Sequence, residues 1–187
     1  ALFQNTTGGS NTASGYGALH KNTTGGSNTA SGYAALFQNT TGHHNTASGS
    51  GALQKNNGSY NTASGYGALY ANTRGNYNTA SGHGALLSNR TGFNNTASGS
   101  YALHTNTTGS YNTAVGQAAG RRNTTGNSNV FIGYYAGANS AYQNQSNKLV
   151  IANGGYSNNE LITGDFAAHE VNINGNLHAS GNLTQNS

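Results

Sequence analysis

The stretch NTASGYGALHKNTTGGS, residues 11–27, is one complete copy of a unit that recurs along most of the chain. The triplet Asn-Thr-Ala, replaced at the last position by Asn-Val-Phe, starts at Asn11, Asn28, Asn45, Asn61, Asn78, Asn95, Asn112 and Asn129. These starts are 17 residues apart, except that Asn45 and Asn61 are 16 apart. A fixed short period is typical of solenoids, in which each repeat stacks only on its neighbours.

The residues of the unit favour β-structure. Asn, Gly and Thr are poor helix formers, and the unit is too short for two packed helices. The Gly after each Asn-Thr-Ala-Ser can adopt a positive φ and turn a corner. The segment Asn-Thr-Thr-Gly is predicted to form a second corner, with Asn side chains stacked from coil to coil. We therefore predict an all-β protein, a β-solenoid of about eight 17-residue coils over residues 1–140, with two short strands and two turns per coil.

The composition excludes several classes of protein. Hydrophobic residues are 33% and charged residues 5% of the 187, and Pro, Cys, Met and Trp are absent. Ordinary globular domains are about 45–50% apolar and about a quarter charged. Without Cys there is no disulfide framework and no thiolate metal site. No apolar run is long enough for a membrane-spanning helix, so we predict no membrane insertion.

The core that one chain can build is small. The recurring apolar pair in each unit is Ala-Leu, for example Ala18-Leu19 and Ala35-Leu36. Burial of one Leu and a few Ala per coil gives only a modest stabilisation. It is small compared with the free-energy cost of the conformational entropy lost when a whole coil becomes ordered. Packing several solenoids side by side would bury more Leu, Ala and Tyr surface. We therefore expect the partner of the chain to be itself, most simply as a homotrimer.

The orientation of the Asn-Thr-Ala-Ser strand decides which side chains reach solvent. Alternate residues of a strand point to opposite faces, so Thr12 and Ser14 share one face and Ala13 takes the other. In the last unit Val130 and Ile132 replace Thr and Ser. Because this pair is apolar, we predict that its face, and hence Thr12 and Ser14, points into the core. The reverse orientation stays open and would place a flat Thr-x-Ser array on the surface.

The chain is poor in the groups that catalysis requires. Glu160, Asp165 and Glu170 are its carboxylate residues, and all follow the repeats. No acidic residue within the repeats can orient a His, and no pair of carboxylates can act there. We therefore predict that the protein is not an enzyme and needs no cofactor. No metal site is predicted. Among the histidines His178 is the candidate ligand, since one His per chain on a threefold axis would supply three ligands, and the alternative is a surface or packing His.

Candidate ligand-binding residues come from aromatic and basic columns. Aromatic residues that follow the corner Gly or the Ala-Leu pair are predicted to stack for stability. Those that precede each Asn lie in a turn, where Tyr can stack on sugars. The repeats are mildly basic, which favours a cell-surface glycan or envelope receptor. The charge is too sparse to predict nucleic-acid binding. The candidates are Tyr60, Tyr77, Tyr111, Arg74, Arg90, Arg121 and Arg122.

The stretch SNVFIGYYAG, residues 128–137, resembles the head repeats of trimeric autotransporter adhesins, which carry Val and Ile in this alternation before Gly. The 17-residue units resemble related repeats in phage tail fibres and other bacterial fibrous surface proteins. They differ from the adhesin repeat in length and in having Thr and Ser in place of Val and Ile. The resemblance implies an adhesin-head-like trimeric β-roll located outside the cell, on a virion or a bacterial surface.

The remaining residues, 141–187, resemble a different part of such fibres. NKLVIAN at 147–153 and ELITGDF at 160–166 are similar to the segment that precedes an auto-processing intramolecular chaperone domain in tail fibres. The triplet Gly-Asn-Leu at 175–177 and again at 181–183 is similar to a short trimeric β-stalk. We therefore expect 141–187 to be a C-terminal β-rich, stalk-like segment.

Two functions of different kinds follow. The first is a structural and receptor-binding fibre protein, the shaft or head of a tail fibre or surface adhesin, that mediates attachment to a cell surface. The alternative is an ice-binding β-solenoid, which requires an outward Thr-x-Ser array. The residues of that array would be Thr12, Ser14, Thr29, Ser31, Thr46, Ser48, Thr62 and Ser64. A scaffold without a ligand is the third hypothesis.

Overall fold

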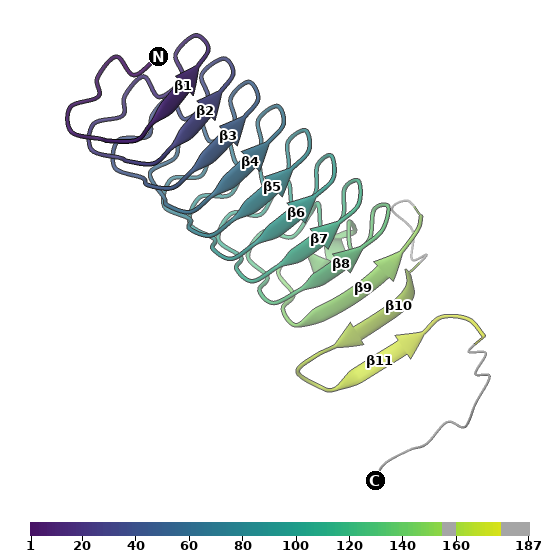
Figure 1. Ribbon diagram of the computed structural model, residues 1–187. Helices are drawn as coiled ribbons and strands as arrows, with labels where there is room; N and C mark the ends of the chain where they lie inside the picture. The colour runs from purple at the N-terminus through teal and green to yellow at the C-terminus, as the bar shows by residue number, and fades with distance from the viewer. Residues whose placement is uncertain (155–159, 177–187) are drawn as a thin grey trace.

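The structure is a computed structural model, and it describes residues 1–154 and 160–176. It is an all-β solenoid with one three-residue strand in each coil, which confirms the predicted fold class. Figure 1 shows the strands side by side along a rod that ends in the C-terminal hairpins. The strands are β1 (Thr12–Ser14), β2 (Thr29–Ser31), β3 (Thr46–Ser48), β4 (Thr62–Ser64), β5 (Thr79–Ser81), β6 (Thr96–Ser98), β7 (Thr113–Val115) and β8 (Val130–Ile132).

Strands β1 to β8 pair in parallel and in register. Each Thr lies beside the Thr of the next coil, as Thr12 does beside Thr29. The shorter unit keeps this register, since Thr46 still pairs with Thr62. A deletion outside the strand therefore leaves the face of every side chain unchanged, whereas a one-residue slip within it would reverse the faces.

The sheet continues past the repeats. A 3-10 turn, η1 (Ser140–Tyr142), leads to β9 (Lys148–Ala152), which pairs in parallel with β8. Strands β10 (Glu160–Asp165) and β11 (Glu170–Ile173) then add on in antiparallel order. Within the described residues, β1 to β11 form one continuous sheet. The trimeric stalk and a division of the chain at residue 140 stay predictions.

The predicted orientation of the strand is wrong. Ala30, Ala47 and Ala63, the central strand residues, are each only 1% exposed, whereas the Thr and Ser on either side of them are exposed. The physical reason is that the strand Ala packs with the Leu of the second wall in one buried apolar cluster, which favours the small apolar residue over Thr or Ser on the inner face. In the last coil, Ile132 is 40% exposed and Phe131 is fully buried. Val130 and Ile132, on which the prediction was based, therefore face outward.

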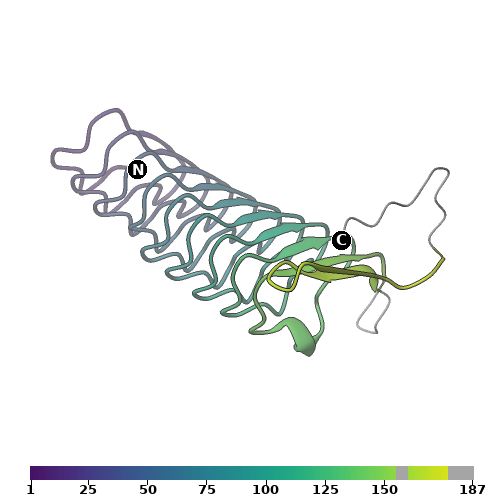
Figure 2. The ribbon, with the colours of Figure 1, turned by 90° about the horizontal axis from the view of Figure 1, so that it is seen from below.

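The expectation of two strands per coil is also wrong for residues 1–154. The second wall contains the Ala-Leu pair, which is fully buried, as predicted, from Ala18-Leu19 through Ala102-Leu103. Each Leu has a positive φ, 49° at Leu19, so the chain turns there and does not run extended. Backbone bonds between coils persist without a strand, since the Leu19 N–H donates to the Ala35 carbonyl at 3.0 Å. Figure 2 shows these coils stacked in line.

Buried Asn side chains connect the coils. In the predicted ladder at the Asn-Thr-Thr-Gly corner, each amide Nδ2 donates to the Oδ1 of the Asn in the preceding coil, at 2.9 Å from Asn39 to Asn22. A second ladder runs through the Asn before each strand, where the Asn78 amide donates to Asn61 Oδ1 at 3.2 Å. The Asn78 amide also donates to the Gly92 carbonyl at 2.9 Å. These bonds provide hydrogen-bond partners for the buried Asn side chains, which lie in the interior beside the small apolar core.

The core changes composition at its C-terminal end. Phe131 takes the position that Ala has in the earlier strands, and Gly120 and Gly137 take the positions of Leu. A Cβ on Gly120 would lie 2.5 Å from the Phe131 ring, and one on Gly137 would lie 2.2 Å from it. The two glycines thus provide the space that the aromatic ring fills.

Candidate binding surfaces

The outward side of the sheet, here called the strand face, carries two columns of hydroxyl side chains. The Thr column contains Thr12, Thr29, Thr46, Thr62, Thr79, Thr96 and Thr113. The Ser column contains Ser14, Ser31, Ser48, Ser64, Ser81 and Ser98. Coils lie about 4.8 Å apart, and the two columns are about 6.6 Å apart along the strand. The structure thus brings together all eight residues of the Thr-x-Ser array at the surface.

Both columns become apolar toward the C-terminus. Residues paired in register share a face, so the Thr column continues as Val130, Leu149, Gly164 and Val171. By the same pairing, the Ser column continues as Val115, Ile132, Ile151, Ile162 and Ile173. Val115 is 44% exposed and Val171 is 62% exposed. We call these side chains, without Gly164, the apolar end of the strand face.

The three predicted ligand-binding tyrosines lie in one column but form two groups. Tyr60 and Tyr77 are exposed and stack in parallel, with ring centroids 4.9 Å apart. Tyr111 lies two coils further on and packs edge-on against Phe93 at 5.0 Å. Their exposure confirms the surface position that was predicted from the turn.

The four predicted arginines are also distributed over several coils. Arg74 and Arg90 are exposed at the Asn-Thr-Thr-Gly corners of neighbouring coils. Arg121 lies over the ring of Tyr101 at 5.5 Å, and Arg122 is the exposed residue that follows it. The seven predicted residues therefore line different parts of the rod and do not form a single site.

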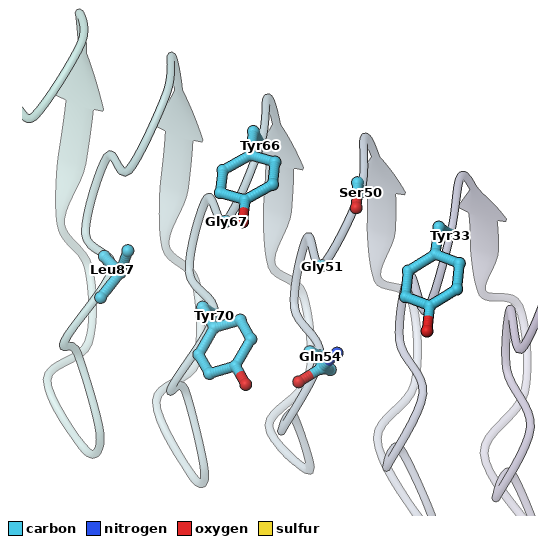
Figure 3. Close-up of a pocket in the computed structure, with 8 residues that line it drawn as sticks. All are labelled: Tyr33, Ser50, Gly51, Gln54, Tyr66, Gly67, Tyr70 and Leu87. Atoms are coloured by element: carbon cyan, nitrogen blue, oxygen red, sulfur yellow. The ribbon is translucent and has the colours of Figure 1, made fainter.

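A site that sequence analysis missed lies in the column after the corner glycine. Tyr16 stacks on Tyr33 with centroids 5.5 Å apart, and Tyr66 stacks on His83 at 5.2 Å. Ser50 stands between these two pairs, and a pocket of about 390 Å³ opens there. Figure 3 shows Ser50 between the rings of Tyr33 and Tyr66. The signal in the sequence was Ser50, at a position that holds Tyr or His in the two coils on either side.

Asp165 and Glu160 form polar contacts at the C-terminal strands. Lys148 and Asp165 pair across β9 and β10 and form a salt bridge. The hydrogen bond from Lys148, with a further bond from the Ala167 N–H, lowers the pKa of Asp165. Asn139 donates to Glu160 Oε1 at 2.9 Å. Burial, with the Glu160 charge adding to it, raises the pKa of Tyr142.

Within the repeats, the fold perturbs the titration of His104. Its side chain lies in the column after Ala-Leu, and its Nδ1 is buried without a hydrogen-bond partner among the described residues. Burial lowers the pKa of His104, and the positive charge of Arg121 lowers it further. Both effects disfavour the protonated form of His104.

His178, the candidate metal ligand, lies outside the described residues. Among residues 1–154 and 160–176, no cluster of three or more His, Asp or Glu side chains is placed to hold a metal ion. In the same part of the chain, no helix has the length and apolar character needed to cross a bilayer.

Comparison of the chain with protein-family models, with curated proteins and with solved structures found no match. The likeness to adhesin heads and tail fibres therefore stays a prediction from the repeat residues.

Proposed function

We propose that the protein is a structural and receptor-binding fibre protein that acts outside the cell, on a virion or a bacterial surface. In this proposal the strand face packs against further copies of the chain in a homotrimer. The sides of the rod remain free to contact a cell-surface glycan or envelope receptor. The observation that carries the proposal is the continuity of the strand face from the Thr and Ser columns into its apolar end.

The apolar end supports contact between copies. Contiguous exposed apolar side chains on one face mark an interaction surface. Val130 and Ile132 extend the columns of Thr113 and Val115 in register, so a partner that covers the apolar end also meets the hydroxyl columns. A second copy of this chain offers columns with the same spacing along the whole rod, and closed symmetry is the usual arrangement of identical chains.

The sides of the rod support attachment. The stacked rings of Tyr60 and Tyr77 and the exposed Arg74 and Arg90 belong to turns outside the strands. Each such contact is small, but three identical chains would repeat every contact around the fibre. Linked weak contacts raise the apparent affinity by orders of magnitude without any new contact.

The double variant V130T/I132S tests the proposal because it gives β8, which lies in the apolar end, the Thr and Ser side chains of the earlier coils. We expect the wild-type chain to bind members of a printed glycan array and the variant to bind at least about tenfold more weakly, as avidity is lost. Leu161→Ser is the matched control, since Leu161 is exposed and lies outside both columns. Wild-type protein that binds no glycan and no cell surface would instead favour a scaffold without a ligand.

Ice binding is the second candidate function, and one specific observation favours it. The Thr and Ser columns are exposed and in register over six successive strands, from Thr12 and Ser14 to Thr96 and Ser98. This arrangement competes with the fibre for the same face, because a face buried between copies cannot contact ice. Ice-crystal shaping at high protein concentration that is lost in T46E/T62E would support ice binding. Ice growth unaffected by the wild-type chain would remove it.

A further inference from the structure

The column of rings after the corner glycine is interrupted at one coil. Tyr33 and Tyr66 flank Ser50 and belong to coils two steps apart, which places their rings about 10 Å apart at about 4.8 Å per coil. A ring inserted midway would lie about 5 Å from each, which matches the 5.5 Å between Tyr16 and Tyr33. The space, here called the Tyr33–Tyr66 slot, is therefore one ring thick.

Two small neighbouring residues keep the slot open. Gly51 follows Ser50 with a φ of 67°, and a Cβ there would lie 3.5 Å from the Tyr70 ring, an ordinary contact. The coil that contains Ser100 provides the comparison. There Tyr101 occupies the position of Gly51 with a φ of 59°, and its ring packs 4.9 Å from His83. Tyr101 thus fills the space that remains empty beside Ser50.

The lining of the slot suits a ring with polar edges and no charge. The Tyr33 and Tyr66 rings form the two walls, and Tyr70 and Leu87 lie on the neighbouring wall of the coils. Ser50 and Gln54 supply hydrogen-bonding groups, and no charged side chain lines the pocket. The volume of about 390 Å³ falls within the range of small-molecule sites, about 300–1,000 Å³.

We propose that the Tyr33–Tyr66 slot binds one pyranose ring of an uncharged glycan. The C–H faces of the sugar pack on the two Tyr rings, as apolar faces do on aromatic side chains. Its hydroxyl groups reach Ser50, Gln54 and the tyrosine hydroxyls. The absence of charge in the lining selects a neutral over an anionic sugar, because an unpaired charge loses solvation without compensation. This inference rests on the proposed attachment function and assigns a receptor contact to particular residues.

Saturation-transfer NMR on the whole chain, with neutral methyl pyranosides as probes, tests the site. The probes are the methyl glycosides of glucose, galactose and N-acetylglucosamine, and sialic acid is the anionic comparison. At least one neutral probe should receive saturation and the anionic probe none.

Gly51→Tyr should weaken that binding at least about tenfold, because it reproduces the filled arrangement of Tyr101. Gly51→Ala is the matched control for the backbone and should retain binding. Tyr16→Ala, outside the slot, should retain it too.

The outcomes separate the site from the attachment function. Saturation of no neutral probe, or equal binding by the Gly51→Tyr and Gly51→Ala variants, would overturn the site. Binding of p-cresol in place of any pyranoside would overturn it in favour of an aromatic side chain from a protein partner. If the wild-type chain binds the array and no neutral pyranoside receives saturation, attachment stands and the site is wrong. If a pyranoside binds the slot and the wild-type chain attaches to no glycan array or cell surface, the site stands and the proposed attachment is wrong.

Discussion

Asn57 accepts the hydrogen bonds that a missing backbone carbonyl would receive from Thr40. Its Oδ1 lies 2.7 Å from the Thr40 backbone N and 2.6 Å from the Thr40 hydroxyl. One coil earlier, the backbone carbonyl of Thr40 accepts the equivalent bonds, from Thr23 N at 3.1 Å and the Thr23 hydroxyl at 2.9 Å. The 16-residue unit therefore keeps its contacts because a side chain replaces the deleted residue.

Removal of this acceptor should weaken the short coil. Asn57→Ala leaves the Thr40 donors without a protein partner, and we expect a loss of about 1 kcal/mol, since water reaches this turn. Asn57→Asp keeps the accepting oxygen and should remain near the wild-type free energy of unfolding. Equilibrium urea unfolding measures both. Equal destabilisation by the Ala and Asp variants would show that the oxygen does not matter.

The buried Asn ladder should be more sensitive. Asn78 donates to Gly92 and Asn61, and its own Oδ1 accepts from the Asn95 backbone N at 3.0 Å. Asn78→Ala leaves buried partners unsatisfied, at about 1–3 kcal/mol for each group. We expect a loss of several kcal/mol in urea unfolding. Asn94→Ser, at an exposed position that holds Ser in other coils, should cost well under 1 kcal/mol, about the size expected of a surface change. If Asn78→Ala lowered the free energy of unfolding by as little as Asn94→Ser, a structural role for the ladder would be contradicted.

Phe131 and Gly137 replace the Ala and Leu of earlier coils, so we expect the effects of their substitutions on stability to be coupled. Gly137→Leu introduces a side chain against the Phe131 ring and should destabilise by about 1–3 kcal/mol through overpacking. Phe131→Ala leaves a cavity and should cost about 3–5 kcal/mol. The double variant F131A/G137L gives this coil the Ala and Leu of the earlier coils, so it should lose less than the sum of the two. A double-mutant cycle from urea unfolding measures the coupling, and strict additivity would contradict it.

Acidification should destabilise the repeats through His104. Its pKa is lower in the folded state than the ordinary 6.5, because of burial and the Arg121 charge. The unfolded chain thus binds more protons, so stability is complete above about pH 6.5 and falls as the pH decreases below it. His104→Phe, which introduces the residue that Phe37 provides in the same column, should reduce the fall in urea midpoint between about pH 7.5 and 5. The exposed His43→Ala variant is the control. An unchanged fall in His104→Phe would contradict the assignment.

Much of the fold follows from the repeat itself. The period predicted the stacked coils, and the recurring Ala-Leu pair and the corner Asn predicted a buried column and a ladder. The strand orientation was not predictable from Val130 and Ile132 alone, because an apolar pair indicates burial without saying whether the core or another molecule provides it. The residue that discriminates is Phe131, whose size fits the core only because Gly120 and Gly137 leave room, a relationship between coils that no single unit displays.

The proposed binding site was harder to predict than the fold. Tyr60 and Tyr77 were identified as exposed from their position in a turn, and they are exposed. The Tyr33–Tyr66 slot was missed because it results from the absence of an aromatic ring at Ser50 and Gly51. Such a gap becomes visible only when the column is compared with the coil of Tyr101, where the same space is filled.

The mass of the chain in solution, measured by multi-angle light scattering, tests the central claim that the strand face joins copies of the chain. The account predicts a mass of three chains of 19.0 kDa for the wild type. It predicts dissociation in V130T/I132S, with the solenoid retained by circular dichroism, and a wild-type mass in the Leu161→Ser control. A folded wild-type monomer at micromolar concentration would contradict the account.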